Sequence, residues 1–309
     1  MSTSQIQIPP AFAKNNTALI TGGASGIGLA LATRLLSHHG LRVLVADKDA
    51  SSLYRLSLSP ETAGLHTFEM DVGSLSDWRR LKAHIEDLWG GQLNVLALNA
   101  GRGLPTSFND AEDPTNFVET MQTNVLGVVN GITTMLPLVQ KTVTAEKEKE
   151  KEKGGANSKA AIIITGSKQG ITNPPGNPAY NASKAAVKTL AEHLAFDLST
   201  TSHHPKDIAV HLLVPGWTFT GMTGRGGKKK EEKPAGAWWP EQVVEFLEKK
   251  MEEEKFYVIC PDNDVSEEMD RRRMVWAMGD VVENRPPLTR WRGDGWKEKA
   301  EEGMKKLDV

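Results

Sequence analysis

The sequence predicts an α/β fold: one doubly wound domain with a parallel sheet of about seven strands and helices on both faces. Two observations support this prediction. Short apolar runs alternate with segments of helical periodicity, which is typical of repeated βαβ units. A glycine-rich segment, 21–28, directly follows the first apolar run and opens a helix, which makes the first strand-turn-helix unit. Right-handed crossovers between parallel strands then leave helices on both faces.

The strands are expected where the apolar runs lie. In chain order, these are residues 18–20, 43–46, 65–70, 95–98, 161–164, 208–214 and 256–259. The clearest helix between them is 75–89, in which Trp78, Leu81, Ile85 and Leu88 share one face.

Length and composition exclude several classes of protein. The chain has 309 residues and a formal net charge of -2, so no global basic field attracts nucleic acid or an anionic membrane. The basic run 228–230 is followed at once by two glutamates, which argues against nucleic-acid binding there. Cys260 is the single cysteine and follows an apolar run, so we expect a buried, inert thiol. No apolar run approaches the ~20 residues that span a bilayer, and the first residues do not resemble a signal peptide. We therefore expect a cytoplasmic protein with no membrane partner.

We expect the catalytic domain to cover 17–284. A polar N-terminal arm, 1–16, precedes it, and a C-terminal extension, 285–309, follows it. The extension contains Trp291 and Trp296 but shows no recognisable chemistry.

Two segments interrupt the regular alternation. The charged, low-complexity segment 145–159 is expected to be a mobile surface insertion on the edge away from the ligand, with a partner-binding arm as the alternative. The loop 221–240 follows an expected strand and contains Trp238 and Trp239. We expect a mobile lid there, with ordered packing against the core as the alternative.

A dinucleotide site is expected at 21–28, because glycines there allow a tight turn and let backbone amides reach a pyrophosphate at a helix N-terminus. The candidate residues are Gly22, Ser25, Gly26, Ile27 and Gly28. Asp47 ends the second expected strand, where an acid binds ribose hydroxyls and repels a 2′-phosphate. This favours NAD(H), and NADP(H) stays possible because Lys48 is adjacent. Asp47 is also compatible with capping the helix that follows it.

Ser167, Tyr180 and Lys184 form a candidate acid–base site. Tyr180 and Lys184 are four residues apart, so on a helix they lie on one face, and Ser167 follows an expected strand that can face that helix. A free tyrosine has a pKa of about 10, and a neighbouring cation lowers it. We therefore expect Lys184 to lower the pKa of Tyr180 until the phenol is a usable acid or base near neutral pH.

Together these motifs resemble the short-chain dehydrogenase/reductase family, whose fold is of the Rossmann type, over residues 17–259. The segment 21–28 resembles the family's cofactor motif. Asp71 and Val72 resemble its adenine contact, and Asn99, Ala100 and Gly101 resemble the turn that closes the nucleotide pocket. Seven such motifs stand in the family's order.

The remaining motifs resemble the family's catalytic tetrad and its nicotinamide-binding turn. Asn124 resembles the helix asparagine of a tetrad that Ser167, Tyr180 and Lys184 complete. The turn after the sixth expected strand resembles the one whose threonine holds the nicotinamide carboxamide, with candidates Pro215, Gly216, Thr218 and Thr220.

The resemblance implies an oxidoreductase that transfers a hydride between a nicotinamide cofactor and a secondary alcohol or ketone. In it, Tyr180 donates or accepts the proton, Lys184 holds the ribose, Ser167 binds the substrate oxygen, and Asn124 positions Lys184 through a water. Candidate substrate residues are Lys168, Gln169, Trp217 and Met222, which suggest a medium-sized apolar or aromatic substrate.

Other interpretations remain open at this point. A non-catalytic sensor of NAD(H) could use the same fold. A metal hydrolase is disfavoured, because the histidine pairs 38–39 and 203–204 lack spaced acid or cysteine partners and are better explained as loop residues, so no metal is expected. The resemblance implies pairing through the helices that bear Asn124 and Tyr180, so we expect a homodimer or homotetramer.

Overall fold

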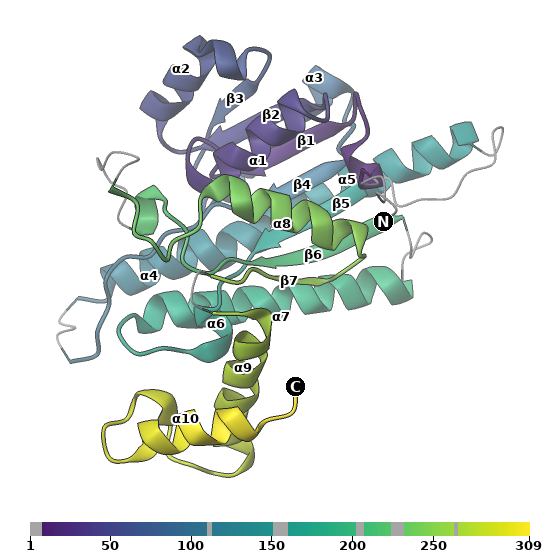
Figure 1. Cartoon of the computed structure of the whole chain (residues 1–309). Helices are drawn as coiled ribbons and strands as arrows, with labels where there is room; N and C mark the ends of the chain where they lie inside the picture. The colour runs from purple at the N-terminus through teal and green to yellow at the C-terminus, as the bar shows by residue number, and fades with distance from the viewer. Residues whose placement is uncertain (1–7, 110–112, 151–159, 202–206, 224–231, 263–264) are drawn as a thin grey trace.

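The computed structural model describes residues 8–109, 113–150, 160–201, 207–223, 232–262 and 265–309. Its centre is a sheet of seven parallel strands in the order β3-β2-β1-β4-β5-β6-β7 (Figure 1). The strands are β1 (Thr17–Thr21), β2 (Arg42–Asp47), β3 (His66–Glu69), β4 (Val95–Leu98), β5 (Ala160–Thr165), β6 (Ile208–Val214) and β7 (Tyr257–Ile259). All seven predicted strands are confirmed, with bounds that differ by at most one residue at each end.

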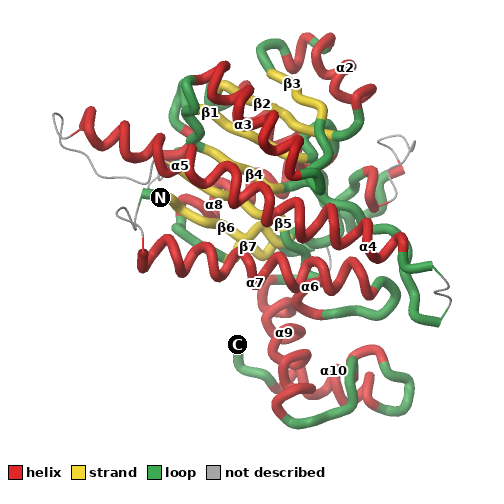
Figure 2. The backbone as a smooth tube through the Cα atoms, turned by 180° about the vertical axis from the view of Figure 1, so that it is seen from behind, coloured by secondary structure: helices red, strands yellow, loops and turns green. Residues whose placement is uncertain are grey.

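Helices cover both faces of the sheet, which confirms the predicted fold class. One face packs against α1 (Gly26–Ser37), α2 (Ala50–Leu58) and α8 (Pro240–Glu252). The opposite face, seen in Figure 2, packs against α3 (Leu75–Trp89), α5 (Gly127–Glu150) and α7 (Pro178–Thr201). In α3 the side chains of Trp78, Leu81 and Ile85 are fully buried, and Leu88 packs beside them, as its periodicity predicts.

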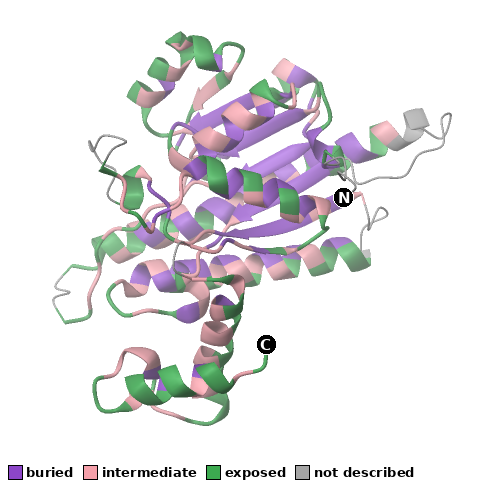
Figure 3. Ribbon diagram, in the orientation of Figure 1, coloured by how far each residue is buried: buried purple, intermediate pink, exposed green. Residues whose placement is uncertain are grey.

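The central strands form the core because their side chains are apolar on both faces. Five of the six residues of β5 are buried, and β1 is buried throughout (Figure 3). Two-sided burial is what a parallel sheet between helix layers requires. The strand order reverses direction between β1 and β4, and in this fold class ligands bind at the carboxyl ends of the strands on either side of that point.

Two predicted boundaries fall inside ordered structure. In the N-terminal arm, residues Pro10–Phe12 form a 3₁₀ turn, and the Phe12 side chain is fully buried in the core. At the other end, α9 (Glu267–Val282) and α10 (Trp296–Lys306) form an arm that projects from the sheet (Figure 1). Arg285 lies over the Trp276 ring of α9 at 4.0 Å, so the boundary at 284/285 divides this arm rather than preceding it.

The charged segment 145–159 begins as helix rather than as loop. Helix α5 continues to Glu150, since the alternating Glu and Lys residues are good helix formers. The rest of the segment lies outside the described residues. No helix in the described part of the chain is both long enough and apolar enough to cross a membrane.

The described part of the loop 221–240 packs against the core, which is the alternative left open by the sequence. The Trp238 backbone bonds to Trp217 and Phe219, and its ring lies edge-on to Phe246 at 5.9 Å. The Trp239 ring meets Phe219 edge-on at 5.7 Å. Residues 224–231 lie outside the described residues.

Candidate active site

A cavity of about 260 Å³ lies at the carboxyl edge of the sheet. Most of the residues predicted for the cofactor and the reaction line it. These are Gly22, Ser25, Gly26, Ile27, Asp47, Asp71, Val72, Asn99, Ala100, Gly101, Ser167, Tyr180, Lys184, Pro215, Gly216, Thr218, Thr220 and Met222. Gly28, Asn124, Lys168, Gln169 and Trp217 do not line it.

The glycine-rich turn leaves the start of α1 open toward the cavity. Gly22 and Gly26 have φ of 62° and 54°, the left-handed region that side chains rarely adopt. Ser25 precedes the helix without a side-chain hydrogen bond to its free amides. A Cβ on Gly28 would lie 2.3 Å from the carbonyl oxygen of Gly22, so a glycine at position 28 allows the helix to start this close to the turn. The free amides at this helix N-terminus suit a diphosphate.

Asp47 is held in place by two backbone amides. Its Oδ2 accepts from Ala24 N at 3.1 Å, and its Oδ1 accepts from Asp49 N at 3.1 Å. The cap of α2 is Asp49, whose carboxylate accepts from Ser52 N, so the alternative of Asp47 as the cap is wrong. Lys48 also lines the cavity, beside Asp47.

Asn99 joins the ends of three neighbouring strands. Its Nδ2 donates to the carbonyl oxygens of Thr21 and Gly22 at 3.2 and 3.3 Å, and its Oδ1 accepts from Thr165 Oγ1 at 3.1 Å. The Thr21 hydroxyl in turn accepts from the backbone N of Asn99 and Ala100. Asp71 shapes the next turn by accepting from Gly73 N at 2.7 Å.

Sequence reasoning missed several lining residues. Thr165 lines the cavity and ends strand β5, and a hydroxyl at the last position of a buried strand was the available signal. Further lining residues that carried no separate motif are Lys48, Met70, Arg102, Thr123, Gly166, Gly221 and Thr223.

Ser167, Tyr180 and Lys184 meet inside the cavity. The Tyr180 phenol is hydrogen-bonded to the Ser167 side chain. The Lys184 ammonium lies 5.8 Å from the centre of the Tyr180 ring and donates to the Thr165 carbonyl oxygen at 2.8 Å. These contacts place a hydroxyl, a phenol and an amine around one point, as the spacing predicts.

The electrostatics of this trio differ from the prediction in one respect. Burial raises the pKa of Tyr180, and the Ser167 hydrogen bond only partly opposes that shift. Burial also lowers the pKa of Lys184 to about 8. The expected lowering of the Tyr180 pKa by Lys184 is therefore wrong for this structure. Burial of the phenol disfavours its charged form more than the Lys184 ammonium, 5.8 Å from the ring centre, favours it.

Asn124 lies behind the cavity in a π-helical turn, Gln122–Leu126, between α4 (Thr115–Met121) and α5. Its side chain is fully buried. Asn124 Oδ1 accepts from Arg102 N at 2.8 Å, while its Nδ2 donates to Arg102 O at 3.0 Å and to Ser183 Oγ at 2.8 Å. A Cβ on Gly101 would lie 3.3 Å from Asn124 Oδ1 and 3.4 Å from Lys184 Nζ, so both groups approach one backbone position.

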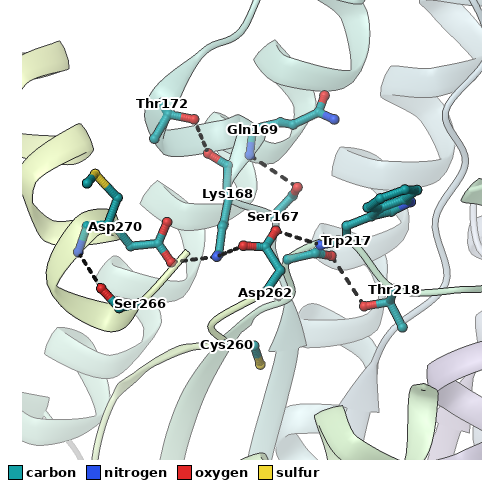
Figure 4. Close-up of polar contacts among 12 residues, drawn as sticks. Ser167, Lys168, Gln169, Thr172, Trp217, Thr218, Cys260, Asp262, Ser266 and Asp270 are labelled. Atoms are coloured by element: carbon teal, nitrogen blue, oxygen red, sulfur yellow. Dashed lines mark hydrogen bonds and ion pairs between the residues drawn. The ribbon is translucent and has the colours of Figure 1, made fainter. Parts of the chain in front are cut away.

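The predicted substrate residues separate into two groups. Met222 lines the cavity, and its sulfur lies near Gly103 and the Tyr180 ring. Gln169 is exposed, and Trp217 is 45% exposed beside the cavity rather than in its wall. Lys168 points away from the cavity, toward Asp262 and Asp270 (Figure 4).

Groups outside the cavity bear on the metal and thiol predictions. No three histidine, cysteine or acidic side chains in the described part of the chain are placed to hold a metal ion. His39 is not a free loop residue, because its Nε2 lies 2.8 Å from Glu248, which also pairs with Arg34. His203 and His204 lie outside the described residues.

Cys260 is buried, and burial raises its pKa to about 12, so the thiol is protonated at neutral pH.

Comparisons with known proteins identify relatives of this chain. A family model described as short chain dehydrogenase matches residues 16–231. Cis-2,3-dihydrobiphenyl-2,3-diol dehydrogenase of Pseudomonas sp. (strain KKS102) is 28% identical over 215 residues, 68% of each chain. Dehydrogenase/reductase SDR family member 4 of Homo sapiens is 30% identical, over 71% of this chain and 72% of the relative.

Solved structures show the same fold. A short-chain dehydrogenase/reductase from Burkholderia phymatum, in complex with NAD, has a TM-score of 0.73 at 22% identity, covering 89% of this chain and 96% of that one. Pseudomonas aeruginosa RhlG, solved as an NADP active-site complex, has a TM-score of 0.63 at 28% identity, covering 78% and 91%. The chain therefore belongs to the short-chain dehydrogenase/reductase family of oxidoreductases.

Proposed function

We propose that this protein interconverts a secondary alcohol and a ketone with NAD(H), and that Tyr180 donates or accepts the proton. The observation that carries the proposal is the contact between the Ser167 and Tyr180 hydroxyls, with Lys184 beside them, inside a cavity that extends to Asp47. This arrangement offers a proton donor and an oxygen-binding hydroxyl at one end and a nucleotide site at the other.

The residues present fit a nicotinamide dinucleotide. Gly22 and Gly26 line the cavity, Gly28 lets the turn close tightly against the Gly22 carbonyl, and the free amides at the start of α1 suit the diphosphate. When bound, the cofactor would supply the hydride exchange with the substrate carbon. Thr218 and Thr220 lie in the turn after β6, where they can bind the nicotinamide end.

Tyr180 is suited to act as the acid in reduction. Because burial raises its pKa, the phenol stays protonated at neutral pH and can give its proton to a carbonyl oxygen. Ser167 donates a second hydrogen bond to the same oxygen. Lys184, with a pKa of about 8, is mostly cationic at neutral pH and stabilises the phenolate that remains. The described partners of Asn124 are Arg102 and Ser183, so its link to Lys184 through a water stays a prediction.

NAD(H) is preferred over NADP(H) in this proposal because Asp47 is fixed at the cavity wall by two amides. A 2′-phosphate about 4 Å from this carboxylate would cost roughly 1 to 4 kcal/mol, depending on screening. Lys48 would offset part of this cost, so NADP(H) is expected to bind more weakly rather than not at all.

The chemistry of the inner cavity favours an apolar or aromatic substrate of medium size. The Met222 thioether, which lines the cavity together with Tyr180, is uncharged. We further propose a cytoplasmic homodimer or homotetramer that pairs through the helices near Asn124 and Tyr180. Val118, Leu126 and Phe196 on these helices are exposed at 58%, 44% and 65%, which supports this assignment.

The test is turnover of the purified protein with a panel of alcohols and ketones, each with NAD(H) and with NADP(H). Loss or gain of NADH absorbance with apolar secondary alcohols or ketones is the expected result. Cofactor binding without turnover of any panel member would contradict the proposed activity. Turnover of small polar sugars alone would contradict the proposed substrate class.

A further inference from the structure

A largely enclosed lysine between two carboxylates lies next to Ser167 in the chain. Lys168 Nζ is 2.9 Å from Asp262 Oδ1 and 2.5 Å from Asp270 Oδ2 (Figure 4). The side chain of Lys168 is 12% exposed, and that of Asp270 is 2% exposed. We call Lys168, Asp262 and Asp270 the lysine cluster. Its burial means that each charge depends on the others, because little water is available to replace a lost partner.

The cluster joins segments that are far apart in the sequence. Lys168 follows Ser167 after strand β5, Asp262 follows strand β7, and Asp270 lies in the first turn of α9. The second oxygen of Asp262 accepts from the backbone N of Trp217 at 3.0 Å. A continuous set of polar contacts therefore runs from α9, through Lys168 and Asp262, to the turn 215–220 that lines the cavity.

The contact between Asp262 and that turn is close-fitting. A Cβ on Gly216 would lie 2.7 Å from Asp262 Oδ2, so the carboxylate packs directly on the backbone of the turn. On the other side of the cluster, the Ser167 hydroxyl accepts from Gln169 N at 3.2 Å, and the Lys168 carbonyl accepts from Thr172 Oγ1 at 3.0 Å. The turn 215–220 is therefore in close contact with Asp262, and the segment 167–172 is held by its own hydrogen bonds.

Helix α9 offers a firm attachment for Asp270. Ser266 caps the helix by accepting from Met269 N at 3.1 Å, and Asp270 N donates to the Ser266 carbonyl at 3.0 Å. Burial raises the pKa of Asp270, and its contact with Lys168 opposes that shift. Nearby charged groups are Arg273 and Arg290, on α9 and on the following turn.

We propose that Lys168, Asp262 and Asp270 are positioning residues for the reaction. Helix α9 sets the position of Ser167 through Lys168, and sets the position of the turn 215–220 through Asp262. The C-terminal arm is then part of the catalytic unit, and Lys168 acts from behind the site rather than on the substrate. This inference rests on the proposed function for its kinetic consequences, but its structural consequence can be measured without turnover.

The main experiment compares Asp270→Asn with Glu248→Gln. Glu248 is a matched control because its side chain is 9% exposed and pairs with Arg34 between two helices away from the cavity. For Asp270→Asn we expect kcat to fall between about 10- and 100-fold, since small misplacements of reacting groups have effects of this size. The cofactor KM should rise by a smaller factor than kcat falls, because Asp47 and the glycine-rich turn, which would hold the other end of the dinucleotide, are untouched. Glu248→Gln should keep kcat within twofold at a similar loss of thermal stability.

Hydrogen exchange gives a readout that needs no substrate or cofactor. The amides of residues 216–220 should exchange about tenfold faster in Asp270→Asn than in the unchanged protein, and at an unchanged rate in Glu248→Gln. This result would support the coupling even if the proposed activity failed. Unchanged exchange at 216–220 in folded Asp270→Asn would overturn it.

Two further variants protect the test against misfolding. If Asp270→Asn does not fold, the triple variant Lys168→Met, Asp262→Asn and Asp270→Asn removes all three charges of the lysine cluster, which buried sites tolerate better than the loss of one. That triple variant should show the same loss of kcat and the same faster exchange. Lys168→Arg should keep kcat within about threefold, because it retains the charge and can reach both carboxylates. A folded triple variant with kcat within twofold of the unchanged protein would overturn the proposal.

Discussion

Replacement of Lys184 by methionine is expected to stabilise the protein while abolishing its activity. Lys184 is fully enclosed, and burial lowers its pKa from 10.5 to about 8. A shift of this size corresponds to roughly 3 kcal/mol by which the folded state disfavours the charged amine. Methionine removes that penalty but also loses the hydrogen bond to the Thr165 carbonyl, worth about 1 kcal/mol. Lys184→Met should therefore be more stable than the unchanged protein by about 2 kcal/mol at pH 7.

The difference in stability between Lys184→Met and the unchanged protein should shrink as pH rises. The folded-state pKa of Lys184 lies below the unfolded value, so the penalty is fully present below pH 8. As pH rises from about 8 toward 10.5, the folded protein loses this proton first, and the penalty disappears. Urea unfolding of both proteins at intervals across this range measures the difference directly. A variant that is less stable than the unchanged protein at pH 7, or a gap that stays constant with pH, would refute the reasoning.

Three further substitutions test the nucleotide and proton-transfer assignments. Tyr180→Phe should lower turnover about 100- to 10,000-fold, while an NADH fluorescence titration shows that binding survives; retained turnover would contradict the acid–base role. Asp47→Asn should lower the ratio of kcat/KM with NAD to kcat/KM with NADP at least about tenfold, because the charge that repels a 2′-phosphate is gone; an unchanged ratio would mean that another group selects the cofactor. Gly28→Ala should weaken NADH binding at least about tenfold, since its Cβ would meet the Gly22 carbonyl at 2.3 Å. Gly293→Ala, where the added Cβ meets nothing within 4 Å, is its control, and equal binding by the two variants would count against the tight-turn argument.

The sequence predicted the fold well because most of its central strands are short, largely apolar runs. Burial on both faces leaves a strand such as β5 a polar residue only at its end, Thr165, so its limits are visible as changes of composition. The candidate site was equally visible, since the residues that line it follow those strands directly. Asp47, Asn99 and Ser167 each stand at or just after a strand end, where a parallel sheet gathers them.

The parts that the sequence did not predict depend on long-range packing. The pKa direction of Tyr180 depends on how deeply the phenol is buried, and residue spacing carries no information about depth. Lys168 was assigned to the substrate because it follows Ser167, but its partners Asp262 and Asp270 are about a hundred residues away in the chain. The packing of Trp238 and Trp239 likewise requires Phe246 and Phe219, which no local pattern connects to them.

The placement of groups along the strands has a consequence for directed evolution of this enzyme. Strand interiors hold the buried core, whereas the lining residues Arg102 and Met222 lie on the segments that follow strands β4 and β6. A mutagenesis library for new substrates can therefore be restricted to those two segments without disturbing the core. Substitutions selected for heat resistance would lie outside these two segments. Their effects on the free energy of unfolding should add to those of the library substitutions when the two sets share no contacts.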